Sequence, residues 1–228
     1  MNHPPVVAAF DLDGTLTRGG SVFHWLRFLS SDATVARAAL PLTVPLVVGA
    51  LRAGHWADSA KERLFRAVLQ GRDLHDVTVA SRDFILHHLE EEGRPEVLGR
   101  LTWHRDQGHD VVVVSASPQL YVDVVVAELS IAGGLGTRLA VDHRGRLTGG
   151  YEGNNCRGTE KMRRLEEWIA SRHYDQAPII YAYGNSRGDR RLLAGANYPF
   201  DAGRMGRWGA LRNFPRLADE LTSPTSEA

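Results

Sequence analysis

The stretch that most restricts the fold is a short apolar run that ends in two carboxylates. Residues 6–10 read VVAAF, and Asp11-Leu12-Asp13-Gly14 follow at once. An unbroken apolar run of this length is typical of a strand that is buried on both faces of a parallel sheet. Gly14 lets the backbone turn sharply where the strand ends. The sequence therefore predicts that Asp11 and Asp13 lie side by side at the end of a buried strand.

Two further apolar runs also end in polar residues. Residues 111–114 lead to Ser115, and residues 179–183 lead to Gly184 and Asn185. Between the runs lie segments with the periodicity of helices, namely 95–105, 118–129 and 159–171. This alternation predicts an α/β fold with a doubly wound, Rossmann-like parallel sheet. Ligands of such sheets bind at the carboxyl ends of the strands, so we expect one shared site there.

The rest of the chain predicts a second domain. Residues 18–92 interrupt the alternation with a mostly helical insertion, which we interpret as a cap domain that follows the first strand. The core domain would then comprise residues 1–17 and 93–221, and residues 222–228 would form a disordered tail. Alternating stretches within 137–153 predict a small β-hairpin that is appended to the sheet.

The paired carboxylates predict a specific chemistry. A carboxylate can attack phosphorus, and a neighbouring carboxylic acid can protonate the leaving group and later activate water. We assign the first role to Asp11 and the second to Asp13. The alternative is a solvated turn without function, but an Asp-rich turn directly after a buried strand has few structural reasons to exist.

The composition excludes some partners and compartments. In the 228 residues, 27 lysines and arginines balance 27 aspartates and glutamates, so no global charge favours a nucleic acid. Cys156 is the single cysteine, and the first residues lack the pattern of a signal peptide. We expect a cytoplasmic protein that binds no nucleic acid.

The motif DLDGTLT at residues 11–17 resembles the first motif of the haloacid dehalogenase (HAD) superfamily, in its phosphatase branch. Later segments resemble the other motifs in the same order: Ser115 in VVVVSASP, Lys161 in GTEK, and residues 184–189. The resemblance implies a Mg²⁺-dependent phosphatase that forms an aspartyl-phosphate on Asp11. It implies that Ser115 binds a phosphate oxygen and that Lys161 neutralises the nucleophile and the phosphoryl group.

The resemblance also implies which residues make up the site. The predicted catalytic residues are Asp11, Asp13, Ser115 and Lys161. A small phosphorylated substrate would contact Asp11, Gly14, Thr15, Ser115, Ala116 and Lys161.

The metal-binding motif departs from the family's pattern. The family has an aspartate that binds Mg²⁺ where this chain has Asn185, and the later acid is kept as Asp189. The predicted metal ligands are Asp11, Asp13, Asn185 and Asp189. An asparagine carbonyl adds no charge, so we expect weaker Mg²⁺ binding. Two alternatives stay open: Asp189 moves inward to bind the ion, or the site has lost catalysis and only binds a phosphorylated ligand.

The cap resembles that of subclass IB, which contains the phosphoserine phosphatases. In those enzymes a glutamate after the first motif meets the substrate's amino group, but residues 18–25 contain no acid here. Some similar proteins act on phospholipid head groups, and residues 38–51 carry no charge. This segment is too short to span a bilayer and contains two prolines. We favour a buried cap helix or a homodimer contact over peripheral contact with the inner face of a membrane.

Overall fold

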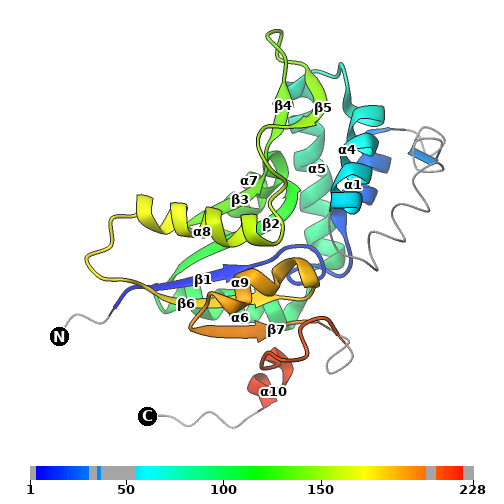
Figure 1. The fold of residues 1–228 in the computed structure, drawn as a ribbon. Coiled ribbons are helices and arrows are strands. Elements are labelled where there is room, and N and C mark those ends of the chain that lie inside the picture. The colour runs from blue at the N-terminus through cyan, green and yellow to red at the C-terminus, as the bar shows by residue number, and fades with distance from the viewer. Residues whose placement is uncertain (1–3, 31–34, 37–54, 204–208, 223–228) are drawn as a thin grey trace.

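The computed structural model describes residues 4–30, 35–36, 55–203 and 209–222 (Figure 1). Within this part of the chain five parallel strands form one sheet in the order β3-β2-β1-β6-β7. The strands are β1 (Val6–Phe10), β2 (Asp110–Pro118), β3 (Gly133–Thr137), β6 (Ile179–Gly184) and β7 (Tyr198–Asp201). The predicted α/β fold with a parallel sheet is confirmed.

The register of the sheet brings the three predicted strand ends together. Phe10, the last residue of β1, lies opposite Val113 of β2 on one side and Tyr183 of β6 on the other. The backbone N–H of Asp11 continues this ladder and donates to the carbonyl oxygen of Tyr183 at 2.9 Å. The residues that follow the three strands therefore share one edge of the sheet.

Helices cover both faces of the sheet because the side chains of each strand alternate between the faces. Ala8 and Phe10 pack with α6 (Pro95–Asp106) and α7 (Gln119–Leu129). Val7 and Ala9 face the other way and pack with α8 (Thr159–Ser171) and α9 (Arg190–Ala194). Two short elements complete this part of the chain, the 3₁₀ helix η2 (Arg187–Asp189) and α10 (Leu217–Thr222).

Between β1 and α6, the described residues form a helical layer at the carboxyl end of the sheet (Figure 1). Its described helices are α1 (Ser21–Leu29), α4 (His55–Leu69) and α5 (Leu74–Glu92). The chain leaves and re-enters the core at adjacent points, since Thr17 and Gly93 form an isolated antiparallel bridge. The proposed division into a core domain and a cap domain places its boundaries at these two points.

The predicted hairpin is present, but it does not extend the main sheet. β4 (Leu139–Val141) and β5 (Leu147–Tyr151) pair only with each other. The hairpin is tied instead to the loop between α4 and α5, because the N–H of Gly71 donates to the Leu147 carbonyl at 2.8 Å. Gly149 lies so close to α4 that a Cβ atom there would be 2.3 Å from the Cα of Arg66. The hairpin therefore packs on the cap.

The uncharged segment 38–51 lies outside the described residues. Contact with a membrane, a homodimer contact through this segment and a cytoplasmic location stay predictions. In the described part of the chain, no helix combines the length and the apolar character that crossing a bilayer requires.

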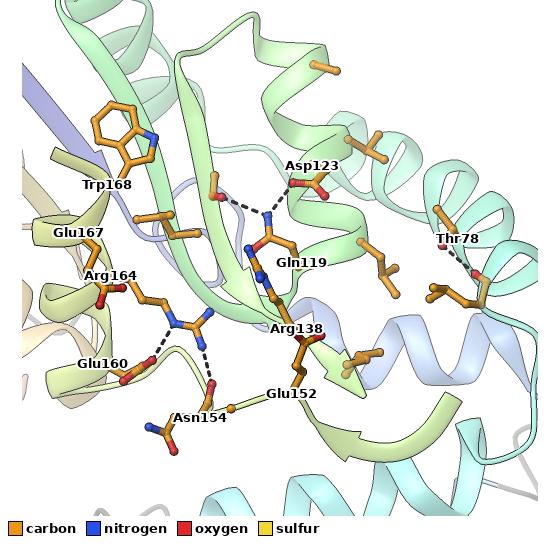
Figure 2. Close-up of a pocket in the computed structure, with 18 of the residues that line it drawn as sticks. Thr78, Gln119, Asp123, Arg138, Glu152, Asn154, Glu160, Arg164, Glu167 and Trp168 are labelled. Atoms are coloured by element: carbon orange, nitrogen blue, oxygen red, sulfur yellow. Dashed lines mark hydrogen bonds and ion pairs between the residues drawn. The ribbon is translucent and has the colours of Figure 1, made fainter. Parts of the chain in front are cut away.

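A groove of about 1270 Å³ lies between the cap helix α5, the core helices α7 and α8, and strand β3 (Figure 2). The charged side chains that α8 contributes to the groove are paired with one another, as Arg164 is with Glu160 at 2.8 Å. At its centre the side-chain amide of Gln119 accepts from the N–H of Gly136 and donates to the carbonyl of Gly134. Gln119 thus satisfies the backbone groups of an edge strand, which would otherwise invite pairing with another chain.

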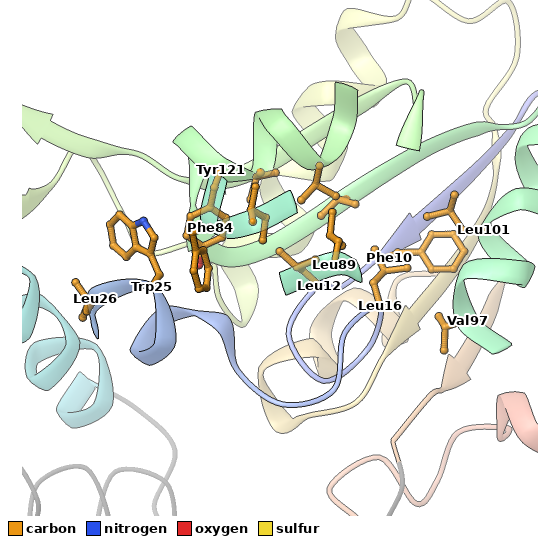
Figure 3. Close-up of a cluster of buried hydrophobic side chains, with 14 of the residues drawn as sticks. Phe10, Leu12, Leu16, Trp25, Leu26, Phe84, Leu89, Val97, Leu101 and Tyr121 are labelled. Carbon is orange, nitrogen blue, oxygen red and sulfur yellow. The ribbon is translucent and has the colours of Figure 1, made fainter. Parts of the chain in front are cut away.

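A continuous hydrophobic cluster joins the core to the cap (Figure 3). Phe10, Leu12 and Leu16 anchor the turn after β1 in this cluster, and all three side chains are fully buried. Towards the cap the cluster continues through Tyr121 to Trp25, whose rings meet edge-to-face at 5.6 Å. Leu12 lies between Asp11 and Asp13 in the sequence, and Leu16 follows them. The burial of both leucines therefore fixes the turn that carries the two carboxylates.

Candidate active site

Asp11 lies buried at the end of β1, with 5% of its surface exposed. The turn after it is closed by the N–H groups of Thr15 and Thr17, which donate to the carbonyl of Leu12 at 3.2 and 3.1 Å. Gly14 makes this turn with φ at +82°, in the left-handed region that favours glycine. Asp11 is thus fixed by the strand that precedes it and by the closed turn that follows it.

Lys161 joins two carboxylates that are far apart in the sequence. Its Nζ lies 2.6 Å from Oδ1 of Asp11 and 2.5 Å from Oδ1 of Asp189, and all three side chains are buried. Lys161 is the third residue of α8, and Asp189 ends η2. Lys161 thus lies beside Asp11, as the sequence predicted.

The three buried charges shift one another's ionisation. Burial raises the pKa of Asp11 to about 7; the Asp189 carboxylate adds to the rise and Lys161 partly offsets it. Burial alone would raise the pKa of Asp189, but Lys161 and hydrogen bonds from Ser186 hold it below the ordinary value. Burial alone would lower the pKa of Lys161, but the two carboxylates raise it. The raised pKa of Lys161 therefore keeps its positive charge beside a carboxyl group, that of Asp11, whose pKa lies near 7.

Thr15 connects Asp11 with Asn185. Its hydroxyl lies 3.1 Å from Oδ2 of Asp11 and 3.3 Å from Oδ1 of Asn185. The amide of Asn185 also packs against the turn, since a Cβ atom on Gly14 would lie 2.0 Å from its Nδ2. Two side-chain oxygens thus converge on one hydroxyl at the edge of the site.

This donor set fits Mg²⁺, which prefers carboxylate and amide oxygens. Asp11 Oδ2 and Asn185 Oδ1 are oxygens of that kind and lie close to each other through Thr15. Among the described residues, no three His, Cys, Asp or Glu side chains gather as metal ligands usually do. The residues that fit the ion are therefore one carboxylate and one amide.

The other two predicted ligands are engaged in hydrogen bonds. Oδ1 of Asp189 accepts from Lys161, and its Oδ2 accepts from the backbone and hydroxyl of Ser186 at 2.9 and 2.7 Å. Asp13 accepts from Ser117 and from the backbone of Ser21. Direct binding of the metal by Asp13 or Asp189 stays a prediction.

Ser115 and Ala116 lie in the C-terminal half of β2, beside the turn that carries the carboxylates. Ser115 is 1% exposed, and its Oγ accepts the N–H of Ser117 at 3.1 Å. The carbonyl of Ala116 accepts from Nζ of Lys61 at 2.6 Å and from the hydroxyl of Thr137 at 2.8 Å. Their roles in binding a substrate stay predictions.

Several residues near the site did not feature among the predicted site residues. They are Ser21, Lys61, Ser117 and Tyr121. Two signals in the sequence pointed to members of this set. Ser117 lies two residues after Ser115, just as Asp13 lies two residues after Asp11. Lysine is rare in this chain: of the 27 lysines and arginines, only Lys61 and Lys161 are lysines.

Comparisons with known proteins agree with this arrangement. A model of the haloacid dehalogenase-like hydrolases matches residues 8–194. The chain belongs to this family. Its membership confirms the resemblance of the DLDGTLT motif and places the chain among hydrolases.

Individual relatives cover most of the chain. It is 31% identical over 194 residues to Protein CicA of Caulobacter vibrioides (strain NA1000 / CB15N), covering 85% of this chain and 84% of that protein. It is 24% identical over 189 residues to a histidinol-phosphatase of Neisseria meningitidis serogroup C (strain 8013), covering 82% and 85%.

Solved structures share the fold. A Bordetella pertussis Tohama I protein of unknown function superposes with a TM-score of 0.72 at 20% identity, over 87% of this chain and 90% of that one. A phosphoserine phosphatase with an analogue of its phospho-aspartyl intermediate gives a TM-score of 0.62 at 17% identity, over 87% of each chain. At these identities the likeness concerns the fold.

Proposed function

We propose that this chain hydrolyses phosphate monoesters, with Asp11 as the nucleophile and Mg²⁺ as the cofactor. The observation that carries the proposal is the buried pair of Asp11 and Lys161 at the end of β1, with Nζ and Oδ1 2.6 Å apart. Asp13 lies two residues further on in the same turn. Membership in a hydrolase family supports the assignment.

In the first step an oxygen of Asp11 attacks phosphorus while the bond from phosphorus to the leaving oxygen breaks. Asp13 gives its proton to that oxygen, so the alcohol leaves neutral. Asp11 then carries the phosphoryl group as an aspartyl-phosphate. In the second step Asp13 takes a proton from a water molecule whose oxygen attacks phosphorus. The bond to Asp11 breaks, and its carboxylate is restored as inorganic phosphate leaves.

The surrounding residues stabilise charge on the transferring group. Lys161 lies 2.6 Å from Asp11 and places its cation beside the phosphoryl oxygens. Ser115 uses its oxygen to accept the N–H of Ser117, which leaves its own hydrogen to donate to a phosphate oxygen. Asp11 and Asn185 would hold Mg²⁺. When bound, this ion supplies further positive charge to the phosphoryl oxygens.

A small phosphorylated metabolite is the substrate class that we propose. Relatives and structural neighbours carry the names histidinol-phosphatase and phosphoserine phosphatase. Residues 18–25 contain no acid that would pair with the ammonium group of phosphoserine. Both phosphoserine and histidinol phosphate therefore belong in a substrate panel, together with sugar phosphates, nucleotides and phospholipid phosphates.

The test compares Asp11→Asn with the wild type. We expect the wild type to release phosphate from p-nitrophenyl phosphate when Mg²⁺ is present and to lose this activity in EDTA. Asp11→Asn should lower the rate by at least about 10³-fold, because the nucleophile is lost. Asp175→Asn is the matched control, since Asp175 is an exposed aspartate in the loop after α8.

A second measurement detects the intermediate. Wild-type protein that is quenched in acid during turnover of a ³²P-labelled substrate should retain label that hydroxylamine removes, as an acyl phosphate does. The circular dichroism of Asp11→Asn should match that of the wild type. Turnover that survives in a folded Asp11→Asn variant would refute the proposed function, as would the absence of turnover at every Mg²⁺ concentration.

A further inference from the structure

Three buried hydroxyl groups form a chain that ends at Asp13, the residue to which we assign proton transfer. Ser21, Ser117 and Tyr121 are each fully buried. The hydroxyl of Ser117 donates to Oδ2 of Asp13 at 2.5 Å, and the backbone N–H of Ser21 donates to Oδ1 at 2.8 Å. Both oxygens of the Asp13 carboxylate are therefore held, one from the core and one from the cap.

The hydroxyls continue as a chain behind Ser117. Oγ of Ser21 lies 3.4 Å from Oγ of Ser117 and 2.8 Å from the hydroxyl of Tyr121. Ser117 donates its single hydrogen to Oδ2 of Asp13, so its own oxygen can only accept from Ser21. Ser21 in turn can only accept from Tyr121. Every hydroxyl in this chain then points its hydrogen towards Asp13.

The chain is rigid because its far end is fixed in the hydrophobic cluster. The Tyr121 ring packs edge-on against Trp25 at 5.6 Å, and Nε1 of Trp25 donates to Ser81 at 2.7 Å. A buried hydroxyl that lost its partner would be destabilising, so the chain is held together as a unit.

Proton transfer demands such rigidity. A general acid accelerates a reaction only when its carboxyl group lies within hydrogen-bond reach of the leaving oxygen. Each carboxylate oxygen has two lone pairs, and the hydrogen bonds from Ser117 and from the backbone of Ser21 use one on each oxygen. Asp13 thus keeps a site for the transferred proton while its orientation is set by its neighbours.

We propose that Ser117 is a positioning residue that aims Asp13 at the leaving group, with Ser21 and Tyr121 holding Ser117 in place. The proposal rests on the proposed function, because it assumes that Asp13 is the general acid and base. It extends that function to the cap: Ser21 is the first residue of α1, so the helix that begins the cap shares the carboxylate with the core.

The experiment compares two substrates whose leaving groups differ in how much they need a proton from a general acid. p-Nitrophenolate leaves readily without protonation, whereas an alkoxide from an alkyl phosphate does not. We measure kcat/KM, which covers the steps up to formation of the phosphoenzyme, for p-nitrophenyl phosphate and for an alkyl phosphate. Ser117→Ala should lower kcat/KM by about 10²-fold for the alkyl phosphate, within the range of general acid catalysis. The loss for p-nitrophenyl phosphate should stay below about 5-fold.

Two further variants separate positioning from folding. Ser117→Thr keeps the hydroxyl and should restore most of the activity towards the alkyl phosphate. Ser81→Ala is the control, because it removes another buried hydroxyl that contacts Trp25 and not Asp13. This control should leave the ratio of the two kcat/KM values unchanged.

An equal loss for both substrates in Ser117→Ala would overturn the inference, because a purely structural role affects both alike. If Ser117→Ala does not fold, Tyr121→Phe decides, since it removes only the last hydroxyl of the chain; a selective loss supports the proposal and an unchanged ratio overturns it. These outcomes leave the proposed function intact. Activity in Asp11→Asn would instead refute the proposed function and the inference with it.

Discussion

Replacement of Lys161 by methionine tests the electrostatic structure of the site most directly. Methionine resembles lysine in length and lacks its charge, so Lys161→Met leaves Asp11 and Asp189 buried without the cation that lies 2.6 and 2.5 Å from them. Removal of one partner from a buried ion pair typically costs about 3–5 kcal/mol, because the remaining charge is uncompensated. We expect the free energy of unfolding at pH 8 to fall by this amount.

The cost should depend on pH, and its sign follows from the shifts in the pKa. The variant lacks the charge that lowers the pKa values of Asp11 and Asp189. A carboxyl group with a raised pKa in the folded state binds its proton more tightly there than in the unfolded chain. Its contribution to stability is thus lost as the pH rises above the ordinary value of 3.8. At pH 5, neutralising one carboxylate costs about 1.6 kcal/mol, so the penalty should shrink towards that value.

The assay is urea denaturation in EDTA at pH 5 and pH 8, followed by circular dichroism. Lys61→Met is the matched control, since Lys61 is the chain's other lysine and donates to the carbonyl of Ala116. It should cost about 1–3 kcal/mol at both pH values, as for one charged hydrogen bond. The double variant Lys161→Met/Asp189→Asn should regain part of the stability and none of the activity. A penalty for Lys161→Met below about 1 kcal/mol at pH 8, or equal penalties at the two pH values, would refute the reasoning.

Three other substitutions have expected outcomes. Gly14→Ala should cost about 1–2 kcal/mol in urea denaturation, because φ is +82°, and should lower turnover because the new Cβ displaces the Asn185 amide. Burial lowers the pKa of His104 to about 3, so the folded wild type loses stability as the pH falls below about 6.5. His104→Gln lacks this titrating group. The difference between the free energies of unfolding of wild type and His104→Gln should therefore shrink by about 2 kcal/mol from pH 6.5 to pH 5. Asn185→Asp should lower the Mg²⁺ concentration for half-maximal activity, and an unchanged Mg²⁺ titration would show that residue 185 is not a ligand.

The strands that could be predicted from the sequence are those that consist of continuous apolar residues. β1, β2 and β6 are apolar runs because both faces of a central parallel strand are covered. β3 has the sequence GGLGT and was not predicted, because its glycines are required by close contacts with other elements of the fold. A Cβ atom on Gly133 would lie 2.7 Å from Trp168, and one on Gly136 would lie 2.8 Å from Gln119. Such close approaches between distant segments leave no local periodicity.

The same distinction holds for the site. The position of Asp11 and Asp13 after a buried strand could be predicted from the sequence, because the strand and the turn are adjacent to them in the chain. The contact of Lys161 with Asp189 needs α8 and η2 to be packed on the same sheet, so the sequence did not indicate it. The hydroxyls of Ser21 and Tyr121 come from opposite sides of the boundary between cap and core. No spacing within either segment points to the other.

The asparagine at position 185 has an electrostatic rationale in this arrangement. Asp11 already has a pKa raised by burial and by Asp189, and Lys161 is the cation that both carboxylates contact. A carboxylate at position 185 would lie one hydroxyl away from Asp11, through Thr15, and would raise the pKa of Asp11 further in the metal-free protein. Under the proposed function, an amide at position 185 keeps Asp11 closer to its ionised form before Mg²⁺ binds, and it binds the ion less strongly than a carboxylate would. Asn185→Asp should therefore destabilise the metal-free protein and increase the stabilisation that Mg²⁺ adds. Thermal denaturation with EDTA and with saturating Mg²⁺ measures both effects, and a variant as stable as the wild type in EDTA would show that the two carboxylates do not interact.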